Sequence, residues 1–206
     1  SLAWLCTYHM ALNQMQEWSE KLHSKGQLGD VEYLINQIAF SEYLAQIKGG
    51  IPMSQGEIIR LSNLGINIDD EPFFKNPYLK NLINEGASED CMRLLITLLK
   101  DSSKDGSVGN LGLDNELKII RVQFRRFTIE RVDPYAQSWH LEDKLLPISL
   151  IEDMANLGVF GLTIPEQYGG SGQSKVAMCV LSEELSRGYI GVGSISTRSD
   201  IAADLI

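Results

Sequence analysis

Apolar residues recur every three or four positions along much of this 206-residue chain. In one segment, Leu117, Ile120, Phe124 and Phe127 stand at positions i, i+3, i+7 and i+10. This spacing places apolar side chains on one side of an α-helix, which has 3.6 residues per turn. The alternation of apolar and polar residues that indicates a strand is not evident in the sequence. The sequence therefore predicts an all-α fold.

The helical patterns form two blocks, separated by a segment rich in Ser, Gly and Asp. We expect an N-terminal helical domain over residues 1–100, a linker over residues 101–113 and a second helical domain over residues 114–206. Such a composition is typical of a linker, and the simplest explanation of glycines such as Gly109 and Gly112 is flexibility.

Start and stop signals predict helix boundaries in the first block. Lys25-Gly26 is expected to end the first helix, and Asp30 to cap the next. Ser54 and Glu57 have the spacing of a capping box for a short helix that continues through Leu61.

In the second block, Asp114 is the predicted N-cap of the helix that carries the Phe124 pattern. Pro147 is expected to begin another helix, which Gly158 closes. From residue 190 to residue 206, small and apolar residues predict a further helix in close contact with its neighbours or a ligand. The side chains expected to face inward from the Pro147 helix and from the helix after Gly172 are Ile148, Ile151, Met154, Val176, Val180, Leu181 and Leu185.

The charge of the chain excludes some partners. The formal net charge is -9 and the sequence pI is about 4.8. Nucleic acids and anionic membrane surfaces require a basic face, so neither is an expected partner. The sequence contains no apolar stretch long enough to cross a membrane.

Three scattered cysteines, Cys6, Cys91 and Cys179, indicate reduced thiols in a protein core rather than a disulfide framework. This usage predicts a cytoplasmic location. The first residues lack the basic start of a signal peptide.

Three histidines, His9, His23 and His140, are far apart and have no partner at metal-ligand spacing, so we expect no metal site. Glu183 and Glu184 are adjacent and therefore point in different directions on a helix. They cannot share a proton, and we interpret them as surface or ion-pair residues.

The run Gly169-Gly170-Ser171-Gly172 permits two interpretations. Its backbone N–H groups could hold an anion, or the run could be a tight connection between two helices. The second interpretation is favoured.

Thr197 and Arg198 interrupt the small and apolar residues near the C-terminal end of the sequence. A guanidinium in such surroundings needs an anionic partner or a path to solvent. One interpretation is an ion pair with Asp200 or Asp204, and the other is recognition of a substrate.

Four motifs of the second block occur together, in order. They are Phe124-Arg-Arg-Phe127, Val132-Asp-Pro-Tyr-Ala136, the run from Leu157 to Gly172, and Glu183-Glu-Leu-Ser-Arg187. From about Glu116 onward the chain resembles the N-terminal helical domain of acyl-CoA dehydrogenases. These are FAD enzymes that desaturate acyl-CoA thioesters.

Motifs of the first block narrow this resemblance. Ala3-Trp4-Leu5, Met15-Gln-Glu-Trp18 and the run from Gly49 to Glu57 are similar to an N-terminal extension of the subfamily that acts on (2S)-methylsuccinyl-CoA, and so is the run from Ser196 to Ala202. That activity, in the ethylmalonyl-CoA pathway, yields mesaconyl-CoA. The alternatives are a dehydrogenase for another short branched-chain or dicarboxylic acyl-CoA, or a helical interaction module without catalysis.

The resemblance also implies which parts lie elsewhere. In this family the flavin domain and the catalytic glutamate follow the region that this chain covers. We therefore assign no catalytic or cofactor-binding residue and expect the 206 residues alone to be inactive. FAD, electron-transfer flavoprotein and a homo-oligomer are implied for the longer enzyme.

The substrate named by the resemblance ends in a carboxylate. The helix that corresponds to residues 190–206 lines the acyl end of the pocket in this family. Arg198 can form a bidentate, charge-assisted contact with a carboxylate, and Thr197 can add a hydroxyl donor. We therefore predict Thr197 and Arg198 as substrate-binding residues.

Overall fold

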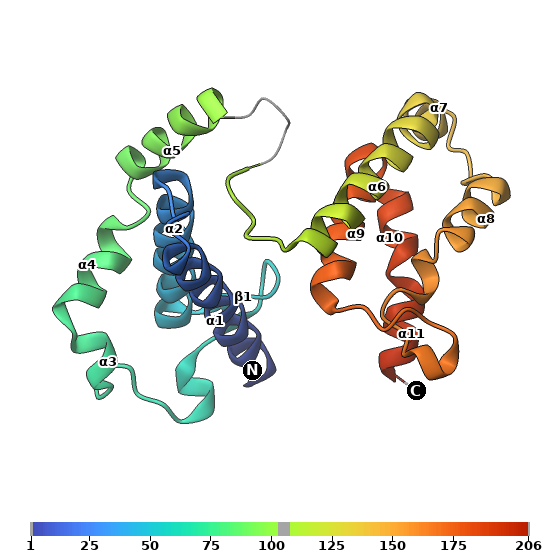
Figure 1. The fold of residues 1–206 in the computed structure, drawn as a ribbon. Helices are drawn as coiled ribbons and strands as arrows, with labels where there is room; N and C mark the ends of the chain where they lie inside the picture. The colour runs from blue at the N-terminus through green and yellow to red at the C-terminus, as the bar shows by residue number, and fades with distance from the viewer. Residues whose placement is uncertain (1, 103–107, 206) are drawn as a thin grey trace. The chain divides into compact units, whose positions relative to one another are not determined.

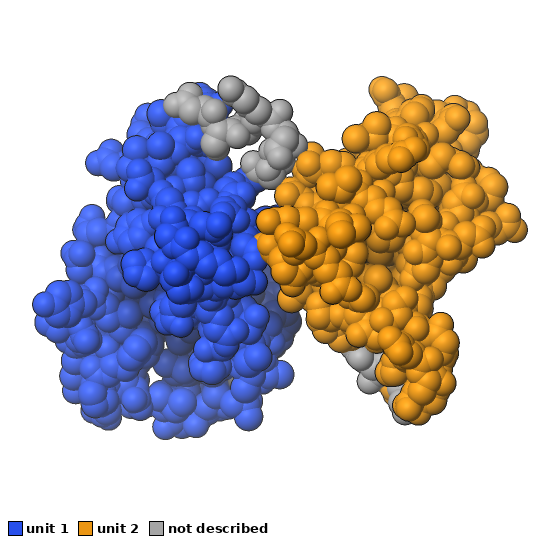
Figure 2. All heavy atoms as spheres, in the orientation of Figure 1, with its two compact units in different colours: residues 1–112 blue, residues 113–206 orange. Residues whose placement is uncertain are grey.

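The computed structural model describes residues 2–102 and 108–205, except for the side chains of residues 101, 102 and 204. The chain divides into two compact units, residues 1–112 and residues 113–206 (Figure 2). Helices account for nearly all the regular structure, so the all-α prediction is confirmed (Figure 1). None of the described helices has the length and apolar character that a membrane crossing requires.

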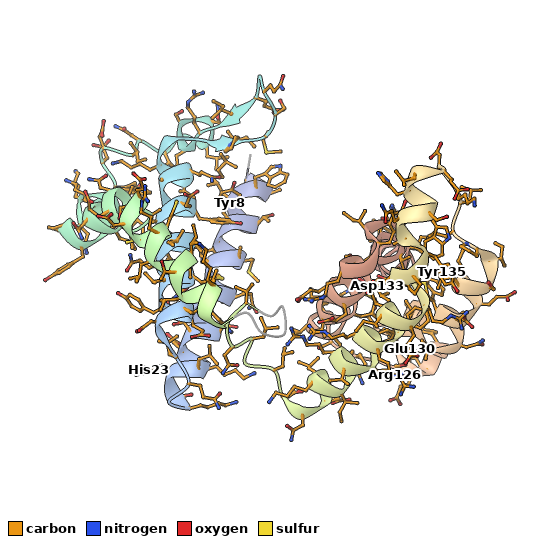
Figure 3. All side chains as sticks on the ribbon, turned by 90° about the horizontal axis from the view of Figure 1, so that it is seen from above. Tyr8, His23, Arg126, Glu130, Asp133 and Tyr135 are labelled. Carbon is orange, nitrogen blue, oxygen red and sulfur yellow. The ribbon has the colours of Figure 1, made fainter. Side chains whose placement is uncertain are left out.

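The first unit begins with two long helices, α1 (Leu2–Ser24) and α2 (Asp30–Gly49), which pack against each other. Leu12 and Leu22 of α1 and Leu34 and Leu44 of α2 are buried. Near the start of α1 and the end of α2, the Tyr8 hydroxyl donates to Gln46 Oε1 at 2.5 Å (Tyr8 is labelled in Figure 3). Apolar burial and this hydrogen bond together hold the two helices against each other.

The segment after α2 differs from the prediction of a capped helix. Residues Ile51–Pro52 (β1) and Ile58–Ile59 (β2) pair as an antiparallel hairpin, with Ile51 opposite Ile59. Ser54 and Glu57 form its turn, in which the Glu57 N–H donates to the Ser54 carbonyl. The capping-box prediction was therefore wrong. Strands of two residues are too short to produce a visible alternation in the sequence.

Four further helices complete the first unit. They are the 3-10 helix η1 (Leu61–Leu64), α3 (Pro72–Lys75), α4 (Pro77–Glu85) and α5 (Glu89–Ser102). The start of α4 follows from its sequence, because Pro77 is the first helical residue and the Asn76 side chain accepts from the Tyr78 N–H. The N-cap of α2 is Gly29, one residue before the predicted Asp30.

The second unit contains helices α6 (Asn115–Arg131), α7 (Asp133–Leu141), α8 (Ile148–Asn156), η2 (Val159–Gly161), η3 (Glu166–Tyr168), α9 (Lys175–Gly188), α10 (Ile190–Ser196) and α11 (Arg198–Leu205). Helix α9 contacts both α6 and α10 (Figure 1). The core gathers apolar side chains from α6 through α10, namely Phe124, Phe127, Val132, Trp139, Leu150, Met154, Val159, Leu162, Ala177, Met178, Leu181, Leu185 and Val192.

Several predicted boundaries of the second unit are confirmed. Asp114 is the N-cap of α6, and its Oδ1 accepts from the Leu117 N–H at 2.9 Å. Gly158 follows α8 with a φ of 78°, a backbone conformation that favours glycine.

Some predicted orientations were wrong. Ile148 is 69% exposed and Val176 is 49% exposed, whereas Leu150 is buried in the core in place of Ile148. Both exposed residues lie in the first turn of their helices. Cys6 and Cys179 are also exposed, so the prediction of core thiols fails for them, although all three cysteines are free.

Over residues 190–205, the part that the structure describes, the predicted helix is two helices. Thr197 separates α10 from α11 with φ -87° and ψ -5°. The sequence gives no proline or glycine at this point, so the break had no local signal.

Candidate functional site

Helices α9 and α10 approach each other closely at a glycine. A Cβ placed on Gly193 of α10 would lie 1.9 Å from Ser186 Oγ of α9. One turn further along, the Ser182 and Ser196 hydroxyl oxygens are 3.3 Å apart, and Ser196 Oγ also donates to the Gly193 carbonyl. The small residues of this region therefore serve first to pack two helices together.

The two predicted substrate residues lie at the junction of α10 and α11. The Thr197 hydroxyl donates to the Ser194 carbonyl at 3.1 Å, and Arg198 Nη2 donates to Ser194 Oγ at 3.1 Å. Arg198 is exposed and Thr197 is half-buried. The structure thus brings Thr197 and Arg198 together around Ser194, with the guanidinium at the surface.

Asp200, the first alternative partner of Arg198, is occupied by other groups. Its Oδ1 accepts from Lys175 Nζ at 2.8 Å and from the Thr163 hydroxyl. These hydrogen bonds, with Lys175 first and Thr163 second, hold the pKa of the Asp200 carboxyl below its usual value. Asp200 therefore ties α11 to the start of α9. The other alternative partner, the side chain of Asp204, lies outside the described residues.

A buried carboxylate that the sequence did not distinguish joins α6 to α9. Glu184 has no exposed surface, and Arg121 Nε and Arg125 Nη2 both donate to its Oε1 at 2.9 Å. Arg125 Nε donates to Oε2, also at 2.9 Å, and Arg187 Nε lies 3.7 Å from the same oxygen. The cluster of Glu184, Arg121, Arg125 and Arg187 is a buried ion network.

Two opposing effects act on the Glu184 carboxyl. Burial raises its pKa, whereas hydrogen bonds from Arg125 and Arg121 lower it, and the net pKa is below the ordinary value. Glu184 is therefore an ionised residue that holds α6 and α9 together. Its neighbour Glu183 is exposed, so the ion-pair interpretation is confirmed for one of the two.

The glycine run is a tight connection. The N–H groups of Gly170, Ser171 and Gly172 donate to carbonyls of residues 165, 161 and 164. A Cβ on Gly170 would lie 2.0 Å from the Ile164 carbonyl oxygen, so the two chain segments leave no room for a side chain. The N–H groups that an anion or a pyrophosphate would need are used within the loop.

The predicted histidines do not converge. His9, His23 and His140 are all exposed. His9 and His23 lie on α1, His23 in its last turn, and His140 lies on α7. Across the described residues, no group of three or more His, Cys, Asp or Glu side chains is arranged to hold a metal ion.

The first unit contains an apolar hollow of about 680 Å³ among α1, α2, η1, α3 and α4. Its polar lining residues stand on α1 and beside α3, and the others are apolar. The lining comprises His9, Leu12, Asn13, Gln16, Phe40, Leu44, Ile47, Leu61, Ile66, Glu71, Phe73, Phe74, Leu79 and Leu82.

Comparison with known families gives the class of the second unit. Residues 114–206 match the model described as "Acyl-CoA dehydrogenase, N-terminal domain". Residues 114–206 therefore belong to the N-terminal domain of the acyl-CoA dehydrogenase family.

One relative extends this similarity to the first unit. The chain is 50% identical over all 206 residues to a (2S)-methylsuccinyl-CoA dehydrogenase of Cereibacter sphaeroides and spans 37% of that relative. A glutaryl-CoA dehydrogenase of Desulfococcus multivorans is 33% identical over 81 residues, which are 38% of this chain and 21% of the relative. A mitochondrial isovaleryl-CoA dehydrogenase of Bos taurus is 35% identical over 83 residues, or 40% of this chain and 20% of the relative.

Proposed function

We propose that this chain is the N-terminal part of an FAD-dependent dehydrogenase that oxidises (2S)-methylsuccinyl-CoA to mesaconyl-CoA. The observation that carries the proposal is the 50% identity that runs through both units. The glutaryl-CoA and isovaleryl-CoA relatives match over 81 and 83 residues. A match through the whole chain favours the methylsuccinyl-CoA activity over the activities of relatives that match less than half of it.

FAD, when bound, accepts the hydride that leaves the β-carbon of the acyl group. The glycine loop of the second unit does not fit the pyrophosphate of such a cofactor, because its N–H groups donate to carbonyls of the same loop. We propose that the cofactor, the catalytic base and the contact with electron-transfer flavoprotein belong to the remainder of the longer enzyme. A homo-oligomer in the cytoplasm is the expected form of that enzyme.

The role that we assign to the described residues is recognition of the acyl group. A methylsuccinyl group carries a free carboxylate, and Arg198 presents an exposed guanidinium whose orientation Ser194 supports. Planar guanidinium and carboxylate groups form paired, charge-assisted hydrogen bonds. The nearby Thr197 hydroxyl donates to the Ser194 carbonyl in the structure, so it would become a second donor for the same group only on leaving that carbonyl.

The glutaryl-CoA relative supports a second candidate, a dehydrogenase for another dicarboxylic acyl-CoA. Glutaryl and methylsuccinyl groups both end in a carboxylate, whereas isovaleryl does not. Arg198 would serve either dicarboxylic substrate, so the choice between them depends on acyl length and branching.

Replacement of Arg198 by Met in the full-length enzyme tests this role. A charge-assisted hydrogen bond contributes about 1.5–3 kcal/mol, so kcat/KM for methylsuccinyl-CoA should fall about 10- to 100-fold. Turnover of butyryl-CoA, which has no distal carboxylate, should change much less.

Arg126→Met is the matched control, because Arg126 is an exposed arginine of α6 that pairs with Glu130 on the same helix (Figure 3). It should leave both substrates unaffected. An equal loss on both substrates from Arg198→Met would contradict the recognition role and indicate a structural one.

A further inference from the structure

Residues 108–112 lie on the first unit through a buried carboxylate. Glu32, in the first turn of α2, is 7% exposed. Its Oε2 accepts from the Gly29 N–H at 3.0 Å, and its Oε1 accepts from the Asn110 N–H at 2.5 Å. Hydrogen bonds to an ionised acceptor are about twice as strong as neutral ones. Glu32 thus connects the start of α2 to a residue 78 positions later.

Helix α1 also contacts Asn110. The Trp18 indole N–H donates to the Asn110 carbonyl at 3.1 Å, so both backbone groups of Asn110 have partners in the first unit. The Asn110 side chain then accepts from the Gly112 N–H at 2.9 Å. These contacts define a short strap, residues 108–112.

Two glycines shape the strap to this surface. Gly109 and Gly112 have φ values of 68° and 67°, a conformation that L side chains rarely adopt. A Cβ on Gly109 would lie 2.9 Å from Glu32 Oε1, and one on Gly112 would lie 3.3 Å from Leu22 Cδ2. Flexibility, the explanation expected from the sequence, does not account for these close contacts.

The second unit begins almost at once after the strap. Asp114 is already fixed as the N-cap of α6, through its bond to the Leu117 N–H. Leu113 is therefore the one residue between the last contact of the strap and the first contact of α6.

We propose that Glu32 and Trp18 form a latch that closes the strap and shortens the connection between the two units to Leu113. Release of the latch would add at least residues 108–112 to this connection. An extended chain spans about 3.5 Å per residue, so the reach would grow from about 3.5 Å to roughly 20 Å or more. The latch is thus a conformational device that sets the length of the connection between the units.

Hydrogen exchange of the full-length protein, followed by mass spectrometry of peptides that cover residues 108–113, tests the latch. The amides of Asn110 and Gly112, whose N–H groups have acceptors, should exchange slowly in the unaltered protein. Glu32→Ala should accelerate their exchange at least about tenfold, because it removes the acceptor of the Asn110 N–H. Glu42→Ala is the matched control, since Glu42 is an exposed glutamate of the same helix, and it should have no effect.

A second variant separates the latch from general damage to the first unit. Trp18→Phe removes the indole donor but keeps an aromatic ring, and it should accelerate exchange in residues 108–113 more than in α1 and α2. Unchanged exchange of residues 108–113 in Glu32→Ala would overturn the proposal. So would acceleration by Trp18→Phe that is equal in the strap and in the two helices.

Discussion

At the scale of single residues, Glu184 contacts three arginines. It is fully buried among Arg121, Arg125 and Arg187, and its backbone carbonyl also accepts from the Thr128 hydroxyl at 3.0 Å. Removal of one partner of a buried ion network leaves the others uncompensated. Glu184 is thus a structural charge whose loss acts on α6 and α9 together.

Glu184→Gln keeps the size of the side chain and removes its charge. We expect the free energy of unfolding of the second unit to fall by about 3 kcal/mol, because two guanidinium groups lose their counter-charge in a poorly solvated place. Chemical denaturation followed by circular dichroism measures the change. The neighbouring variant Glu183→Gln should remain within about 0.5 kcal/mol of the unaltered chain, because Glu183 is exposed. Equal effects of the two variants would contradict this assignment.

The same residue predicts a dependence on pH. Because the pKa of Glu184 is lowered in the folded state, its contribution is fully present above the unfolded pKa of about 4.3 and is lost as pH falls through the folded value. Thermal unfolding between pH 3 and pH 7 should therefore show a steeper loss of stability below about pH 4.3 for the native chain than for Glu184→Gln. Parallel curves for the two proteins would show that Glu184 keeps an ordinary pKa.

The sequence contained a signal for this network, but not a sufficient one. Arg121 and Arg125 are four residues apart and therefore share one side of α6, next to the apolar side that Phe124 marks. The pair Glu183-Glu184 gives no indication of which carboxylate faces that side. The rotation of α9 against α6 decides it, and that rotation depends on the whole core.

At the scale of helices, the contact between α9 and α10 depends on a glycine. Alanine is normally better than glycine within a helix by about 1 kcal/mol. At Gly193, however, a Cβ would overlap Ser186. Packing and helix propensity therefore make opposite predictions here.

We expect Gly193→Ala to lower the free energy of unfolding by about 1–3 kcal/mol, the usual cost of overpacking. Ser186→Gly in the same chain should restore part of the loss, because it removes the Oγ and Cβ atoms that the new methyl group meets. Gly49→Ala is the control for the substitution itself. Gly49 is also helical, and a Cβ there would meet no atom within 4 Å, so stability should be unchanged or higher. Thermal melts of the four proteins check these expectations.

Helices were predictable from the sequence where packing on the core requires apolar residues at a regular helical spacing. They were less predictable where tertiary contacts determine where a helix begins or ends. The α6 pattern of Leu117, Ile120, Phe124 and Phe127 corresponds to the face that packs on the core. The β1–β2 hairpin was missed because it is too short to show a period. The break at Thr197 was missed because neither proline nor glycine marks it.

The residues of the candidate site were predictable from the sequence, but the contacts of their side chains were not. The sequence placed Thr197 and Arg198 in a run of small residues, and their contacts with Ser194 span three and four residues, as on a helix. The break between α10 and α11 at Thr197 had no such signal. The assignment of these residues to a substrate stays a prediction, which the Arg198→Met experiment tests.

At the scale of the whole molecule, the expected activity belongs to a protein longer than this chain. The chain spans 37% of its methylsuccinyl-CoA dehydrogenase relative. We therefore expect residues 1–206 alone neither to retain FAD through gel filtration nor to reduce an electron-accepting dye with any acyl-CoA. The full-length protein should do both. A stoichiometric flavin complex of the shorter chain would contradict the proposed division of parts.

The hydrogen bonds of Glu32 have a consequence for synthesis of the protein. Domains commonly fold in order as they leave the ribosome, where chains grow by about 5–20 residues per second. The first unit can close its bond to Asn110 as soon as residues 108–112 emerge, and it needs no residue that is translated later. At that rate, residues 113–206 take roughly 5–19 s to add. The first unit can thus be complete during this interval, so the nascent second unit grows from a partner that is already folded.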